Sequence, residues 1–240
     1  MTFNISQRKT IKHWATGLFA WLVALTLFFP ILWMIMTSFK TELQAISQPP
    51  LLFWEATFDN YILIQERSDY LKYALNSLYT SVGATFLALI IAVPSAYAMA
   101  FFPGKYTKDI LLWMLSTKML PAVGVLIPIY MITQMGGLLD SIYPLILIFA
   151  LMNLPIIMWM LYTYFKEIPK EILEAARMDG ATTSDELRHI VMPLSWGGIA
   201  SAGLLSLILC WNEAFWSIQL TASDAGTLAA LIASYSSPEG

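Results

Sequence analysis

Residues 73–104 read YALNSLYTSVGATFLALIIAVPSAYAMAFFPG, a run of 32 residues without Asp, Glu, Lys, Arg or His. An α-helix rises about 1.5 Å per residue, so about 20 apolar residues cross a hydrocarbon core of about 30 Å. Lipid cannot satisfy unpaired backbone N–H and C=O groups, so a span must be helical unless it belongs to a closed barrel of short, alternating strands. The run therefore predicts a membrane-spanning helix.

Four more runs lack charged residues and histidine: 14–39 with 26 residues, 119–139 with 21, 141–165 with 25 and 190–212 with 23. We expect the span at 119–139 to begin earlier, near Ile110, and to contain Lys118. The segment 214–240 has one short apolar patch, 227–233, which is too short to span. The sequence therefore predicts an all-α polytopic bundle of five spans, forming one transmembrane domain over residues 1–240.

The composition agrees with this fold class. The chain is 58% hydrophobic and 12% charged, whereas soluble domains carry about 25% charged residues. This excludes an ordinary cytosolic globule, a disordered chain and a nucleic-acid binder with a basic surface. The single cysteine, Cys210, excludes a disulfide framework within the chain.

Basic residues predict the orientation. With the N-terminus in the cytoplasm, the segments 1–13, 103–109 and 166–192 hold nine of the 13 basic residues, and the opposite side holds three. Cytoplasmic loops carry an excess of Lys and Arg. We therefore expect a cytoplasmic N-terminus, and we expect residues 214–240 on the outer side.

The loop 166–192 is the most charged segment, with four basic and six acidic residues. Good helix formers over 170–179 predict a helix that Pro169 can begin and Gly180 can end. The spacing of Thr183 and Glu186 matches a capping box, which predicts a second helix that stops before Pro193.

One face of the first loop helix is flat. Ile172, Ala175, Ala176 and Asp179 have the spacing of a single helix face. Two small side chains there would let the backbone of another protein approach closely. Spacing alone leaves two interpretations open, a docking surface and an ordinary solvated helix.

The identities of the residues in this loop are more informative than their spacing. Glu174-Ala175-Ala176 is followed by Gly180 and then by Ile190 and Pro193. This string resembles the EAA signature of ATP-binding cassette importer permeases. The resemblance covers essentially the whole chain, including the Trp211-Asn212-Glu213 ending of the fifth span, and is closest to the maltose-type sugar and polyol permeases.

The resemblance implies that loop 166–193 is a coupling element that docks into an ATPase subunit. By match, the docking residues are Glu174, Ala175, Ala176, Asp179 and Gly180. It also implies a bacterial inner-membrane location and these partners: a second permease, two ATPase subunits that use ATP and Mg²⁺, and an extracytoplasmic solute-binding protein. The chain itself is expected to bind no cofactor or metal. Family members generally have a sixth span, which this sequence does not reach.

Polar residues inside the spans are candidates for a solute path, because ionisable or polar groups in lipid are costly. Lys118 either lines such a path or extends to the inner interface. Polar residues on the second span and Asn153 either line the path or form interhelical hydrogen bonds. Trp211 either anchors the interface or stacks on sugar. The complete candidate set is Asn76, Ser77, Ser81, Lys118, Asn153, Trp211 and Asn212.

Enzyme motifs are missing. The only Gly-Lys pair, Gly104-Lys105, lacks the rest of a phosphate-binding loop, so ATP hydrolysis is expected in another chain. A secondary transporter should show inverted repeats, which the spans do not. A permease for amino acids or peptides stays open, because the EAA string alone does not exclude it. The sequence predicts an importer permease for a carbohydrate or sugar alcohol.

Overall fold

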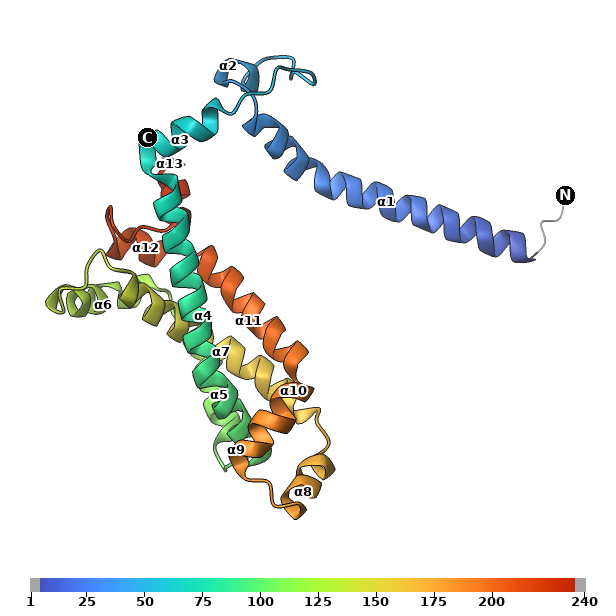
Figure 1. The fold of residues 1–240 in the computed structure, drawn as a ribbon, viewed down its shortest axis with the longest axis vertical. Helices are drawn as coiled ribbons and strands as arrows, with labels where there is room; N and C mark the ends of the chain where they lie inside the picture. The colour runs from blue at the N-terminus through green and yellow to red at the C-terminus, as the bar shows by residue number, and fades with distance from the viewer. Residues whose placement is uncertain (1–4, 236–240) are drawn as a thin grey trace. The chain divides into compact units, whose positions relative to one another are not determined.

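The computed structural model describes residues 5–235, and every regular element in that range is helical. The all-α prediction is therefore confirmed. The chain divides into two compact units, residues 1–69 and 70–240, which are described separately (Figure 1).

The first unit contains α1 (Ile5–Ser38), α2 (Glu42–Ala45) and α3 (Asp59–Ser68). Residues 12–38 of α1 are long and apolar enough to span a membrane. Lys40 follows α1 and is 2% exposed. Its ammonium lies 4.7 Å from the ring centre of Trp33 and 4.6 Å from that of Trp54, and donates to the carbonyl of Leu51. These cation–π contacts and the hydrogen bond order the loop after α1.

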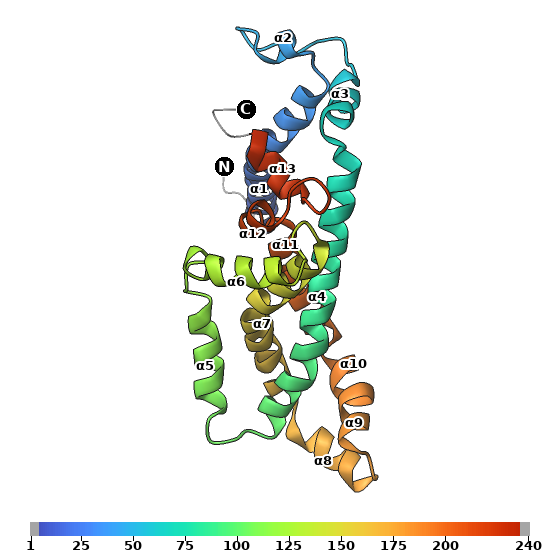
Figure 2. The same cartoon turned by 90° about the vertical axis from the view of Figure 1, so that its left-hand side faces the viewer.

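The core of the second unit consists of α4 (Tyr70–Phe101), α7 (Ile142–Lys166) and α11 (Trp196–Trp211), which lie side by side in Figures 1 and 2. An alanine occurs at every fourth position of α4 and each is at most 5% exposed: Ala84, Ala88, Ala92, Ala96 and Ala100. Small residues at this spacing let helices approach closely, which is how membrane helices gain packing contacts. Leu145, Phe149 and Leu161 of α7 are buried in the same core.

The third predicted span is wrong as a single helix. The chain forms α5 (Thr107–Thr117) and then α6 (Val123–Met135), which turns away from α5 (Figure 2). Pro121 lacks an N–H and disfavours a helical residue before it. Its neighbour Leu120 instead donates to the carbonyl of Thr117 three residues back. The helix therefore ends at this elbow, residues 118–122.

The count of five spans is not confirmed as predicted. Within the described residues, α1, α4 and α7 are each long and apolar enough to cross a membrane. The fifth predicted span, 190–212, covers α11 and the last residues of the helical segment 183–194, and these two are bent by 78° relative to each other. Neither α5 nor α6 has spanning length, because the elbow interrupts that run.

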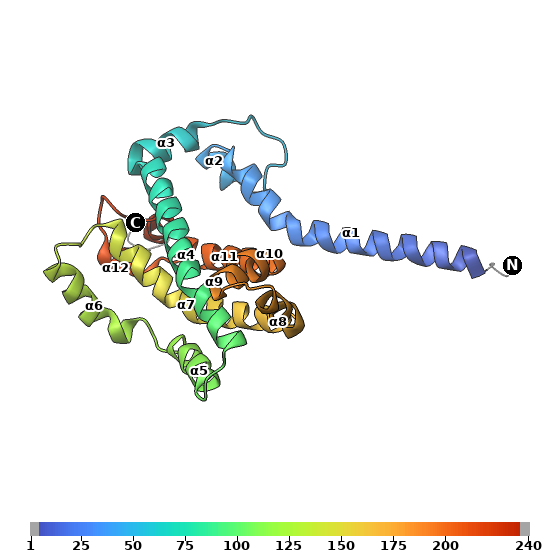
Figure 3. The ribbon, with the colours of Figure 1, turned by 60° about the horizontal axis from the view of Figure 1, so that its bottom comes forward.

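The loops of the second unit gather at two opposite ends. One end holds the start of α5 together with α8 (Lys170–Met178), α9 (Thr183–Asp185), η1 (Glu186–Val191) and α10 (Met192–Leu194). The other holds α12 (Phe215–Leu220) and α13 (Leu228–Tyr235). Figure 3 shows α5 and α6 on one side of α7 and α11 on the other. We call the first end inner and the second outer, following the orientation predicted from the basic residues.

Candidate functional site

The first candidate site is α8 with its exit. Gly180 has φ +88°, a left-handed conformation that glycine adopts without strain. Its N–H donates to the carbonyl of Arg177 at 3.0 Å, and the Ala181 N–H donates to that of Ala176 at 2.9 Å. These two bonds form a Schellman motif, which closes a helix and turns the chain sharply. The prediction that Gly180 ends this helix is confirmed.

The predicted docking residues lie on the surface of the second unit. Glu174, Ala175, Asp179 and Gly180 are exposed, and Ala176 is half-buried. Leu173, in contrast, is 2% exposed and belongs to the hydrophobic core. α8 is therefore attached by one face and presents the predicted docking residues on the rest of its surface.

The capping box of the second loop helix lies one residue earlier than predicted. The capping box consists of Thr182 and Asp185, in place of Thr183 and Glu186. Hydrogen bonds from the hydroxyl and N–H of Thr182 hold the pKa of the Asp185 carboxyl below its usual value. The predicted end before Pro193 is also wrong, because the helical segment continues as the π-helix η1 and as α10 to Leu194. The shift of one residue leaves Glu186 free to point inward.

Glu186 forms a buried charge cluster with Arg177 and Tyr97, which we call the inner cluster. Glu186 is 2% exposed. Its Oε1 accepts from Arg177 Nε at 2.6 Å, and its Oε2 accepts from Arg177 Nη2 at 3.0 Å and from Tyr97 Oη at 2.6 Å. The Arg177 guanidinium also lies 5.1 Å from the centre of the Phe102 ring. The cluster joins α8, η1 and the last turns of α4.

The charges in the inner cluster stabilise each other. The hydrogen bonds from Arg177 lower the pKa of the Glu186 carboxyl below its ordinary value of 4.5, and they outweigh the opposing effect of burial. The same bonds raise the pKa of Arg177. Both groups are therefore charged at neutral pH.

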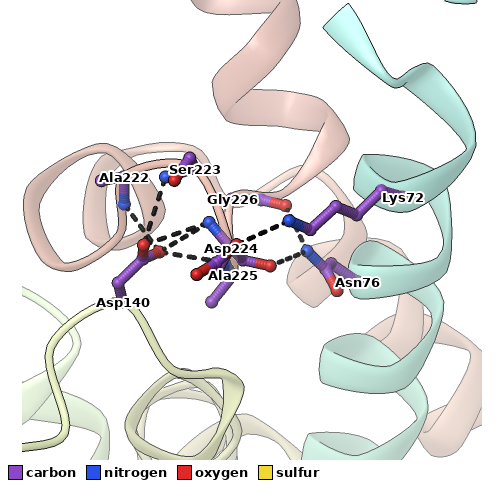
Figure 4. Close-up of polar contacts among 8 residues, drawn as sticks. All are labelled: Lys72, Asn76, Asp140, Ala222, Ser223, Asp224, Ala225 and Gly226. Carbon is purple, nitrogen blue, oxygen red and sulfur yellow. Dashed lines mark hydrogen bonds and ion pairs between the residues drawn. The ribbon is translucent and has the colours of Figure 1, made fainter.

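A second polar site fixes the outer end of the unit (Figure 4). The Asp140 carboxylate accepts hydrogen bonds from four consecutive backbone N–H groups, those of residues 222–225, at 2.9 to 3.2 Å. Burial raises the pKa of the Asp140 carboxyl, but these donors lower it more, and the net pKa lies below its usual value. We call residues 221–227 the outer loop, and Asp140 is its anchor.

The second span also contacts the outer loop. Asn76 Nδ2 donates to the carbonyls of Asp224 at 2.9 Å and Gly226 at 3.0 Å. Lys72 forms an ion pair with the Asp224 side chain at 2.7 Å. The Ser77 hydroxyl accepts from the N–H of Leu228 at 2.7 Å. Two predicted path residues, Asn76 and Ser77, therefore have hydrogen bonds that hold the segment after α12.

Lys118 lies at the elbow between α5 and α6, where its ammonium donates to Asn153 Oδ1 at 3.0 Å. Asn153 is 11 residues from the first residue of α7 and 13 from the last, or about 16 and 20 Å along the helix. The ammonium is therefore near mid-depth, and the interpretation that it extends to the inner interface is wrong. Asn153 Nδ2 donates to the Cys210 thiol at 3.1 Å.

We call Lys118, Asn153 and Cys210 the mid-depth network, and two cavities lie beside it. Lys118, Asn153, Cys210 and Glu213 line one of about 70 Å³. Lys118 and Trp216 line another of about 250 Å³, whose remaining walls are mainly aliphatic. The structure thus brings together Lys118 and Asn153 from the predicted path residues.

The remaining predicted path residues are not part of that network. Ser81 is buried, and its hydroxyl donates to the carbonyl of Ser77 within α4. Trp211 is half-buried and Asn212 is exposed, with its amide donating to the carbonyl of Ile208.

Gly198, Ala202 and Ser206 of α11 are buried at four-residue spacing. A Cβ on Gly198 would lie 2.5 Å from the Tyr164 ring of α7. This seam therefore includes a close approach between α11 and α7 within the chain.

Sequence reasoning missed Asp140 and Glu186 as functional candidates. Asp140 separates two apolar runs, which is the only local signal that it has a special partner. The position of Glu186 is itself a signal, since it lies about two turns before Pro193 in the charged loop. The described residues contain no group of three His, Cys, Asp or Glu side chains arranged to hold a metal ion.

Comparison with known proteins identifies relatives. The family described as "Binding-protein-dependent transport system inner membrane component" matches residues 88–238. The diacetylchitobiose uptake system permease protein DasC of Streptomyces coelicolor is 32% identical, over 78% of this chain and 68% of that protein. The trehalose transport system permease protein SugB of Mycobacterium tuberculosis is 31% identical, over 83% of this chain and 73% of that protein.

A solved structure shares the fold. It is described as a bacterial ABC transporter involved in the import of the acidic polysaccharide alginate, and the similarity covers all of this chain and 84% of that one. The TM-score is 0.75 at 24% sequence identity. The helical arrangement described above is therefore shared with a chain of that transporter.

Proposed function

This chain belongs to the family of binding-protein-dependent transport system inner membrane components, and from that premise we propose that it imports a carbohydrate or a sugar alcohol. It is a multi-pass inner-membrane permease of an ATP-binding cassette importer. Several relatives carry names of saccharide uptake systems, for diacetylchitobiose, trehalose and sulfoquinovosyl glycerol. These names support the substrate class and do not identify the solute.

The partners that we propose are a second permease, two ATPase subunits and an extracytoplasmic solute-binding protein. ATP and Mg²⁺ are assigned to the ATPase subunits, and no cofactor is assigned to this chain. α8 is the proposed contact with the ATPase, through Glu174, Ala175, Ala176, Asp179 and Gly180. The observation that carries this proposal is the exposed surface of α8 next to the left-handed exit at Gly180.

For the solute path we propose the mid-depth network of Lys118 and Asn153. These side chains supply N–H donors beside a cavity at the elbow, and hydroxyl-rich solutes need such groups in an otherwise apolar setting. Asn76, Ser77, Ser81, Trp211 and Asn212 stay candidates for the path from the sequence, although none of them belongs to this network.

Gly180→Val tests the coupling role. A Cβ at Gly180 meets nothing within 4 Å, so valine acts only through the strain of a positive φ. We expect uptake in proteoliposomes to be lost while membrane insertion stays normal. Gly137 is a matched control, because it also has a positive φ and open space but lies near the outer end. Gly137→Val should transport, and normal uptake by Gly180→Val would refute the coupling role.

The substrate class needs a separate experiment. The chain should be purified with its partner subunits, and saccharides, sugar alcohols, amino acids and peptides should be compared for stimulation of ATPase activity through the binding protein. We expect stimulation by a saccharide or a sugar alcohol. Stimulation by an amino acid or a peptide alone would refute the proposed class.

A further inference from the structure

α8 packs on the core through Leu173, but a cavity separates part of its surface from the end of α4. A cavity of about 190 Å³ is lined by Phe101, at the end of α4, and by four residues of α8: Lys170, Leu173, Glu174 and Arg177. A side chain that faces a cavity cannot push on the opposite wall, because dispersion contacts need close approach. Movement of α8 is therefore not transmitted to α4 by contact across this space.

The inner cluster bridges the two helices beside that cavity. Glu186 accepts two hydrogen bonds from Arg177 on α8 and one from Tyr97 on α4, with the three distances between 2.6 and 3.0 Å. Tyr97 is one turn before Phe101, the last residue of α4. A two-point bond between guanidinium and carboxylate fixes orientation as well as distance. Glu186 thus connects α8 to the inner end of α4 with defined geometry.

Stability alone does not explain a carboxylate at this position. A buried ion pair is costly to desolvate, and apolar residues of similar size are often as stable or more stable. The Arg177 side chain is 43% exposed and could remain hydrated without a partner. The carboxylate lies in the π-helix η1, an irregular element that often marks functional positions.

We propose that Glu186 is a positioning residue for energy coupling, which holds α8 and the inner end of α4 as one mechanical body. Displacement of α8 by an ATPase subunit then moves α4 through the carboxylate. α4 packs along α7 and α11, so the displacement reaches the helices around the mid-depth network. This inference rests on the proposed function and adds a residue outside the EAA string.

The test uses the assembled transporter with its partner permease, ATPase subunits and binding protein. Glu186→Gln keeps the side-chain size and removes the charge that binds Arg177 in two-point geometry. We expect normal assembly and continued ATP hydrolysis. Uptake per ATP hydrolysed should fall about tenfold, which is a typical size for coupling between sites. Asp109→Asn is the control, because it removes an exposed carboxylate at the same end without touching the cluster.

Tyr97→Phe gives an independent variant, because it retains the ring and removes only the hydrogen bond to Glu186. We expect a smaller fall in uptake per ATP, about fivefold, since only one of the three hydrogen bonds to Glu186 is lost. If both residues act through this bond, Tyr97→Phe added to Glu186→Leu, which leaves no acceptor for the tyrosine hydroxyl, should be no worse than Glu186→Leu alone. Additive defects would contradict transmission through the Tyr97–Glu186 bond.

The outcomes separate the inference from the proposed function. Wild-type uptake per ATP in both Glu186→Gln and Tyr97→Phe would overturn the inference. Loss of assembly in proportion to uptake would also overturn it, because the cluster would then act only on folding. A wild-type complex without ATP-driven solute uptake would refute the proposed function, and the inference with it.

Discussion

The two ends of the second unit hold their loops by opposite means. At the inner end, a carboxylate is held by the side chains of Arg177 and Tyr97. At the outer end, the Asp140 carboxylate is held by backbone N–H groups of residues 222–225. A contact between side chains depends on the identity of every partner, whereas a contact to the backbone depends on one acid and on the loop's conformation. The structure of the inner end therefore depends on particular side chains, whereas that of the outer end depends on the backbone conformation of the loop.

This difference suits the two proposed roles. A coupling element must transmit a defined displacement, which requires fixed geometry between particular side chains. The outer loop is positioned as a whole, and successive backbone N–H groups form a concave site that suits an anion. Asp140 binds none of the loop's side chains, and those of Ala222, Ser223 and Asp224 are exposed.

The largest effect should come from Arg177→Ala. Glu186 would keep its buried position and lose the Arg177 guanidinium that pairs with it, and an unpaired buried charge is strongly destabilising. We expect the yield of folded, detergent-solubilised protein to fall about tenfold or more, measured by size-exclusion chromatography.

The double variant Arg177→Met with Glu186→Leu is the control for this prediction, because it removes both charges and fills the space with apolar atoms. It should recover the yield but not uptake per ATP. Wild-type yield from Arg177→Ala alone would show that the Glu186 carboxylate is hydrated, and the contrast between the ends would then disappear.

Asp140→Ala should have the next largest effect, and it should be local. The outer loop would lose the acceptor of four N–H groups, but most of these are exposed enough for water to replace it. We expect a loss of about 1–3 kcal/mol in the stability of the loop, and exchange of the amide hydrogens of residues 222–225 faster by about tenfold to a hundredfold. Ser223→Ala is the control, because it retains the N–H that Asp140 binds. An equal increase in Ser223→Ala would contradict recognition through the backbone.

Acid should loosen both ends, the inner end first. The pKa of Glu186 is lowered from 4.5 and that of Asp140 from 3.8, so each carboxylate stabilises the folded state above its ordinary pKa. Each contribution is lost as the pH falls below that value through the lowered pKa. The inner end should therefore begin to loosen below about pH 4.5, and the outer loop below about pH 3.8.

Fluorescence anisotropy of a dye on Met178→Cys or Ser223→Cys measures this order, since a looser segment gives lower anisotropy. The native Cys210 is buried, which favours labelling at the introduced cysteine. In an Asp140→Asn background, the dye at position 223 should show low anisotropy at all pH values. Loosening of the outer loop at the higher pH would reverse the predicted order.

The same contrast explains which features were predictable from sequence. The run 73–104 predicts α4, because length and apolar composition suffice to define a span. Gly180 was predictable, since a left-handed exit restricts the residue type. The outer loop was not predictable, because four backbone N–H groups carry no sequence signature and their partner, Asp140, is 82 to 85 residues away.

Two errors have local causes. The run at 119–139 contains Pro121, and only the tertiary structure decides whether a proline in a span bends the helix or ends it. The predicted capping box lies one residue too late, because Thr182 and Thr183 are both good caps with an acid three residues on. That single residue determines whether Glu186 caps a helix or is buried, so the inner cluster could not be found from the pattern.

The smallest effect should come from Asp224→Ala, although Asp224 is central in Figure 4. Its ion pair with Lys72 joins side chains that are 76% and 39% exposed, and exposed pairs contribute below about 1 kcal/mol. Its backbone N–H and carbonyl, which bind Asp140 and Asn76, remain in the variant. We expect the melting temperature to change by less than about 3 °C, with the difference reduced by salt. Amide exchange across residues 222–225 should stay at the wild-type rate, since backbone contacts define the loop. Exchange as fast as in Asp140→Ala would mean that side chains specify the outer end as they do the inner end.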